Sequence, residues 1–174
     1  LPRLKGGWLN LESRYLIETG AMADAHDICR NTEFLCDMST KQGAVNMSYI
    51  YNSYGVVEMQ HENYIASRNW FDKVYKIRQE HLGYRDLNTV GPQLNILLIL
   101  LYDGKYQEAL DRLPLVEELL SKVPDPGDRL LSLIPEVRST SYMHLGRLNE
   151  AWDELQVSVE MTKHRVKLYS QGSG

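Results

Sequence analysis

The chain has 174 residues, of which 43% are hydrophobic and 24% are charged, and its formal net charge is −4. This composition is typical of an ordinary globular protein. The acidic balance disfavours nucleic acid as a partner, because phosphate binding needs a basic surface. The longest apolar run, 96–102, is too short to cross a bilayer, so we expect no membrane association.

Four segments of the sequence superimpose when the chain is shifted along itself by 42 residues. A turn residue begins the second half of each segment, a small residue follows five positions later, and a larger residue usually stands nine positions later. The turn residues are Gly20, Glu62, Gly104 and Gly146; the small residues are Ala25, Ser67, Ala109 and Ala151; the larger positions hold Cys29, Phe71, Leu113 and Leu155. Such a period is the signature of stacked helical hairpins.

Apolar spacing and turn residues predict a pair of helices in each segment. The pairs are expected at 5–19 and 21–38, 43–61 and 63–81, 87–103 and 105–122, and 128–145 and 147–169. They make one repeat domain over 1–170, with repeats near 5–38, 43–81, 87–122 and 128–169, and 171–174 are expected to be a linker or tail. Pro114 and Pro135 fall inside predicted helices, where each removes a backbone donor and should kink or delay its helix.

Small residues also recur on the first helix of the pairs, at Ser13, Gly55 and Ser139. Together with the small residues of the second helices, they should let the two antiparallel helices approach closely. Phe71, Leu113 and Leu155 should then fill the space between hairpins.

The segments that begin at Leu97 (LILLYDGKYQEA) and Leu145 (LGRLNEA) carry this pattern most clearly. They resemble the tetratricopeptide repeat (TPR) family. The period of 42 residues and the segment IRQEHLGYRDLNT, which begins at Ile77, resemble its kinesin-light-chain-like subclass and the sensor arrays of signalling ATPases. The resemblance implies an all-α fold, a right-handed superhelical solenoid of four hairpins and eight helices. It also implies a scaffold, adaptor or receptor rather than an enzyme.

In that architecture the first helix of each pair lines the concave face. The predicted partner-binding residues on this face are Asn10, Arg14, Tyr49, Asn52, Val56, Met59, Gln60, Asn95, Leu98 and Tyr102. Amides both donate and accept hydrogen bonds, so Asn52 and Asn95 could hold the backbone of a bound segment. The alternative for Leu94, Leu98 and Leu101 is that they only pack against a neighbouring hairpin.

No catalytic motif was found in the sequence: it has no glycine-rich phosphate loop, no nucleophile elbow and no CxxC pair. His26, Cys29, Glu33 and Cys36 would share one face of one helix, but they spread along about 15 Å of helix axis and cannot reach one ion. We therefore expect no metal and no cofactor. The basic cluster of Lys73, Lys76 and Arg78 is interpreted as the solvated face of a helix. Tyr51 and Tyr54 are interpreted as packing between helices.

These features predict a protein–protein interaction module that binds a peptide or a helical segment of a partner in its concave groove, within an adaptor or signalling protein. The alternative is a ligand-sensing receptor array for a small molecule or peptide in a signalling ATPase or regulator. The two cysteines lie seven residues apart on one predicted helix, beyond disulfide reach, which favours a reducing, cytoplasmic location. Exposed terminal hairpins would also allow self-association.

Overall fold

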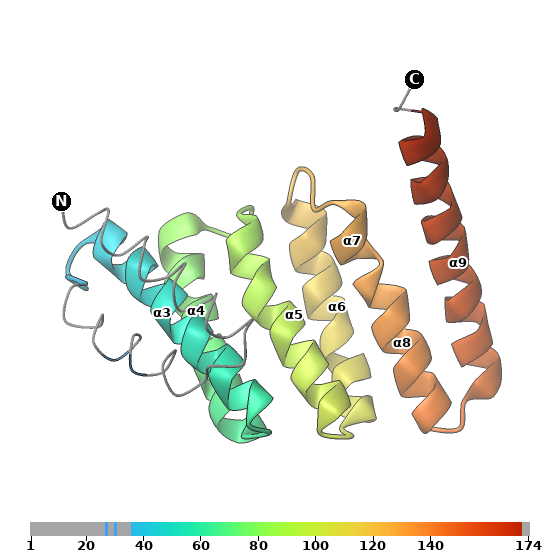
Figure 1. Cartoon of the computed structure of the whole chain (residues 1–174), viewed down its shortest axis with the longest axis horizontal. Coiled ribbons are helices and arrows are strands. Elements are labelled where there is room, and N and C mark those ends of the chain that lie inside the picture. Colours follow the sequence, from blue (N-terminus) through green and yellow to red (C-terminus); the bar gives the residue numbers. More distant parts are fainter. Residues whose placement is uncertain (1–26, 28–29, 31–35, 172–174) are drawn as a thin grey trace. The chain divides into compact units, whose positions relative to one another are not determined.

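The computed structural model describes residues 27, 30 and 36–171, and within these residues the chain is all-helical, with no strand. Six long helices are present, together with one helix of a single turn (Figure 1). They are α3 (Lys41–Gln60), α4 (Tyr64–Leu82), α5 (Leu87–Tyr102), α6 (Tyr106–Lys122), α7 (Asp128–Leu131), α8 (Leu133–His144) and α9 (Leu148–Gln171). The hairpin predicted at 5–38 falls almost wholly on residues outside those described, so the count is six long helices rather than the eight expected. The chain divides into two compact units, Leu1–Ile99 and Leu100–Gly174.

The predicted turns are confirmed in the three described hairpins. Gly104 and Gly146 have φ angles of 71° and 75°, and Glu62 adopts the same left-handed conformation at 61°. At each turn the amide of this residue and the next amide bond back to the end of the preceding helix, as in Asn63 N to Glu58 O at 2.9 Å and Lys105 N to Leu100 O at 2.8 Å. These paired bonds satisfy carbonyls that a helix end leaves without partners. The period of 42 residues therefore repeats one backbone geometry.

The first described hairpin, α3 with α4, packs through the small residues that the sequence indicated. The Ser67 hydroxyl, fully buried, donates to the Gly55 carbonyl at 2.6 Å. A Cβ atom on Gly55 would lie 2.9 Å from the ring of Phe71, which is also fully buried. The glycine therefore lets the two helices approach and seats the phenylalanine between them.

Arg78 corrects one prediction, because it is 4% exposed and not part of a solvated face. Pro92 lies one turn into α5 and has no N–H, so the Asn88 carbonyl loses its helical partner. Arg78 of α4 replaces it, donating from Nη1 to that carbonyl at 2.8 Å and from Nε to Ser48 Oγ of α3 at 3.0 Å. One side chain thus joins three helices.

In the second unit α8 packs against both α6 and α9. α6 continues through Pro114, so this proline does not end the helix. Pro135 does have the expected effect, because its missing N–H leaves the Leu131 carbonyl without a helical donor. The predicted helix 128–145 is accordingly two helices, α7 and α8, separated at Ser132.

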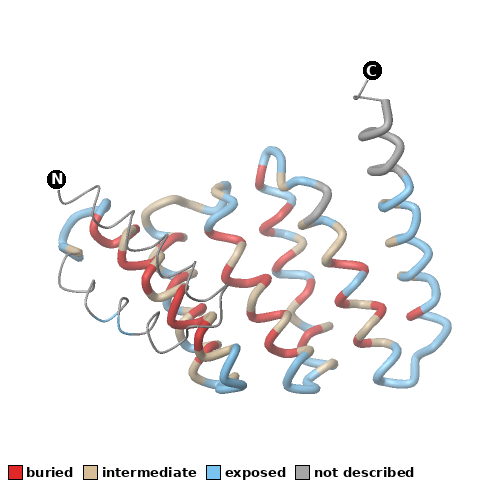
Figure 2. The backbone as a smooth tube through the Cα atoms, viewed as in Figure 1, coloured by how far each residue is buried: buried red, intermediate tan, exposed pale blue. Residues whose placement is uncertain are grey.

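Buried residues run along α3, α5, α6 and α8, whereas α9 is mostly exposed (Figure 2). Phe71 and Leu113 fill the core as predicted, but Leu155 of α9 is 45% exposed, so the prediction was wrong for the fourth repeat. No described helix is both long and apolar enough to span a membrane.

Candidate functional site

The predicted partner-binding residues of α3 lie on its accessible side. Tyr49, Asn52, Val56 and Met59 are half-buried and Gln60 is exposed, while most of the residues between them are buried. Side chains at this spacing share one face of a helix. The structure therefore leaves this stripe of α3 open for contact.

The same holds for α5. Asn95 and Leu98 are half-buried, and Tyr102, in the second unit, is 62% exposed. Leu94 is only 5% exposed, so packing explains it. Asn10 and Arg14 lie outside the described residues.

Tyr49 links the accessible stripe of α3 to the buried arginine. The Arg78 guanidinium lies over its ring, 4.7 Å from the centroid, in a cation–π arrangement. Burial lowers the pKa of Arg78, and electrostatic attraction to Tyr49 and Asp86 opposes that shift. Because Arg78 is itself fixed by Ser48 and the Asn88 carbonyl, the Tyr49 ring is held in one orientation.

The tyrosines interpreted as packing residues do pack. Trp70 of α4 stacks on Tyr51 and Tyr54 of α3, with ring centroids 5.1 Å and 5.0 Å away. Lys73 places its ammonium 3.8 Å from the centre of the Tyr51 ring. This cluster fixes α3 against α4.

A second candidate site is a cleft of about 520 Å³ in the second unit, formed by α6, α7, α8 and α9. Its walls are mostly apolar, and three charged side chains line it. The lining residues are Glu117, Leu120 and Ser121 of α6; Val123 and Pro126 of the loop that follows; Leu131 of α7; Ile134, Pro135 and Arg138 of α8; and Glu154, Val157 and Met161 of α9. Pro135 shapes this cleft in two ways, because it lines the wall and separates α7 from α8.

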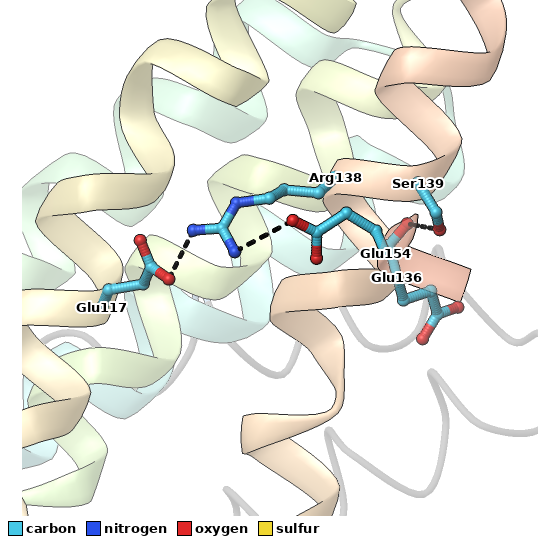
Figure 3. A network of polar contacts seen from close by, with 5 residues as sticks. All are labelled: Glu117, Glu136, Arg138, Ser139 and Glu154. Carbon is cyan, nitrogen blue, oxygen red and sulfur yellow. Dashed lines mark hydrogen bonds and ion pairs between the residues drawn. The ribbon is translucent and has the colours of Figure 1, made fainter. Parts of the chain in front are cut away.

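Arg138 lies between two carboxylates from different helices (Figure 3). Its Nη2 donates to Glu117 of α6, and its Nη1 donates to Glu154 of α9 at 3.5 Å. The three side chains are partly buried, with exposed fractions of 26% for Arg138, 40% for Glu117 and 22% for Glu154. Burial opposes the charged form, but the hydrogen bond and charge of Glu117 and the charge of Glu154 prevail and raise the pKa of Arg138. The guanidinium therefore stays ionised and connects α6, α8 and α9.

Sequence reasoning missed this cleft. Its three charged residues come from separate helices, so no spacing along the chain connects them. The signal that could have pointed to it is Pro135 itself, because a helix interrupted beside a hairpin leaves space that side chains must line.

Of the comparisons with known proteins, the one with solved structures bears on the fold. No protein-family model matches the sequence, and no curated protein matches it either. Among solved structures, the chain resembles BtubC (BKLC) from P. vanneervenii with a TM-score of 0.80 over 95% of this chain, at 11% sequence identity. The match spans 66% of that chain. At this identity the likeness shows the fold alone, which is a TPR-like helical fold of the kinesin-light-chain type.

Proposed function

We propose that this chain is a protein–protein interaction module, and that the accessible stripes of α3 and α5 bind a peptide or a helical segment of a partner. The finer architecture belongs to the same proposal: four TPR-like hairpins in a right-handed superhelical solenoid, within a cytoplasmic adaptor or signalling protein. Nucleic acid, membrane, metal and cofactor have no part in it, and the module is not an enzyme.

The observation that carries the proposal is the accessible stripe itself. Asn52 and Asn95 remain partly exposed amides on helices whose other faces are buried. Val56, Met59 and Leu98 lie beside them in sequence at helical spacing and are also half-buried. Recognition of a peptide segment needs polar groups that hydrogen-bond to the peptide backbone and apolar side chains that contact the peptide side chains. A helix that served only as packing would bury these positions or carry charges there.

Selection from a displayed random-peptide library tests the proposal. Selected peptides should bind the purified chain with dissociation constants of about 1 μM, measured by fluorescence polarisation. Replacing Asn95 and Leu98 together by alanine should weaken binding more than about tenfold, because a hydrogen bond and an apolar contact are both lost.

The matched control replaces Lys76 and Glu80 by alanine, since both are exposed on α4 and lie one helical turn apart. This control should bind like the parent chain, and circular dichroism should show that both variants stay folded. Peptides that bind the Asn95, Leu98 variant as tightly as the parent would place the interaction elsewhere and refute the proposed face.

A ligand-sensing receptor array is the second candidate, and the cleft beside Arg138 favours it because its volume suits a small molecule. Thermal unfolding of the purified chain with a metabolite panel tests this function. A ligand that binds the folded state raises the apparent melting temperature by mass action. If no metabolite of the panel raised the melting temperature, the result would count against a ligand-sensing function.

Self-association is supported by the outer side of α9. Leu148 is 65% exposed, Trp152 62% and Val159 49%, and with Leu155 they form one apolar stripe at helical spacing. We propose that two copies associate through this stripe. Sedimentation velocity should show a larger species that grows with concentration in the parent chain and is absent in Trp152→Ser; a parent chain that stays monomeric throughout would refute this.

A further inference from the structure

We infer that the cleft formed by α6, α7, α8 and α9 binds a small organic molecule with an apolar body and a single positively charged amino group. This inference rests on the second candidate function and gives the chemical class of its ligand. The residues involved are separate from the stripes of α3 and α5, so the two sites can be tested independently.

The size and the walls of the cleft suit a small ligand. Its volume of about 520 Å³ lies within the range of sites that enclose drug-sized molecules. Leu120, Ile134, Val157 and Met161 give it apolar walls from three helices. The methionine adds adaptability, because its unbranched side chain adjusts to different ligand shapes.

The charged side chains that line the cleft favour a positively charged ligand. Two carboxylates, Glu117 and Glu154, line it with one guanidinium, that of Arg138, and no lysine or histidine lines it among the described residues. The formal charge of the lining is therefore −1. Such a surplus is felt strongly where side chains are partly withdrawn from water, as Glu154 is at 22% exposure.

The hydrogen bonds of Arg138 point to the same sign. Both terminal nitrogens of its guanidinium already donate to carboxylates, so the positive charge of Arg138 is offset within the lining, and a ligand carboxylate would be repelled by the two glutamates. An ammonium group is attracted to both glutamates, and each carboxylate can accept more than one hydrogen bond. An ammonium bound between the glutamates would neutralise the surplus charge.

A purely structural role explains only part of this arrangement. One ion pair, Arg138 with Glu117, suffices to connect α6 with α8. Glu154 lies at 3.5 Å, the long end of a hydrogen bond, so its charge is less completely offset by Arg138 than that of Glu117, although its side chain is only 22% exposed. Two carboxylates that share one guanidinium beside an apolar cleft are the feature that a cationic ligand would satisfy.

The test uses three probes with the same alkyl chain: n-octylamine, n-octanol and sodium octanoate, each titrated at neutral pH into the purified chain. We expect octylamine to bind saturably, with amide NMR shifts confined to residues around the cleft, octanol to bind at least about tenfold more weakly, and octanoate to bind least. Equal binding of octylamine and octanol would overturn the charge selection, and absence of saturable octylamine binding would overturn the site.

Substitutions in the cleft lining test whether octylamine binds at this site. Glu154→Gln should weaken octylamine about tenfold and leave octanol unchanged, whereas Glu118→Gln, on α6 but outside the cleft lining, should change neither. Val157→Trp should fill the cleft and block both probes, and Val157→Ala, checked for folding by circular dichroism, should retain both. Octylamine binding that survives both Glu154→Gln and Val157→Trp would overturn the proposed location.

Discussion

Replacing Gly55 by alanine tests whether the close approach of α3 and α4 depends on the missing side chain. In an exposed helix interior this change stabilises by about 1 kcal/mol, because glycine is a poor helix former. Here the new methyl group would lie 2.9 Å from two ring atoms of Phe71 and 3.1 Å from a third. Ordinary contacts between carbon atoms are about 3.5–4.0 Å.

The ring cannot retreat easily, because Phe71 is fully buried. Overpacking of this kind costs roughly 1–3 kcal/mol, so the net effect of Gly55→Ala is a loss of about 0–2 kcal/mol after the helix-propensity gain of about 1 kcal/mol. The Phe71→Leu background should reverse the sign, because the smaller side chain removes the clash and leaves the gain. The coupling between the two sites should therefore equal the overpacking cost.

Urea unfolding of the four chains of this double-mutant cycle, followed by far-ultraviolet circular dichroism, measures both quantities. Proton NMR spectra of each folded variant serve as the control that the fold is retained. If Gly55→Ala stabilised the parent chain as much as it stabilises Phe71→Leu, the small residue would not be what sets the helix spacing, and the reasoning would be refuted.

Three further substitutions follow from the structure and can be measured by the same unfolding assay. Glu62→Gly should raise the free energy of unfolding by about 1 kcal/mol, because it relieves a left-handed backbone at φ 61°; a loss of stability would mean that the glutamate side chain contributes more than its backbone strain. Arg78→Met should lower it by about 2 kcal/mol, since the part-buried Asn88 carbonyl and the fully buried Ser48 hydroxyl lose their donor, and an unchanged midpoint would show that Arg78 is dispensable there. Ser141→Ala should raise it by about 1 kcal/mol, because this buried hydroxyl has no hydrogen-bond partner among the described residues; destabilisation would reveal an unrecognised partner.

Much of the fold could be predicted because the same pattern of turn, small and large residues occurs in several segments of the sequence. The turns recur at a fixed interval, and a helix between two turns has few alternative boundaries. The predicted helix 63–81 is observed as Tyr64–Leu82, and 105–122 as Tyr106–Lys122. Pro135 was correctly expected to disturb its helix, although the sequence did not show that the break falls at Ser132.

The sites were harder to predict because they depend on contacts between helices. In the sequence, Arg78 resembles a solvated basic residue of a helix. Its burial is explained only by the structure, where it donates to the Asn88 carbonyl that Pro92 leaves without a helical N–H partner. Arg138, Glu117 and Glu154 look like ordinary charged residues of amphipathic helices. Their proximity follows from the way α8 packs between α6 and α9, which no local pattern encodes.

The turn at Glu62 bears on how such chains can be detected. Three hairpins close with the same paired amide bonds, yet one of them does so without glycine. The geometry is thus enforced by the two helices that it joins, and the residue at the corner can change at a modest energetic cost. A sequence search that requires glycine at this turn position would miss a repeat of this kind. The backbone fold can therefore be retained where the amino-acid sequence has diverged, as in a fold shared at 11% sequence identity.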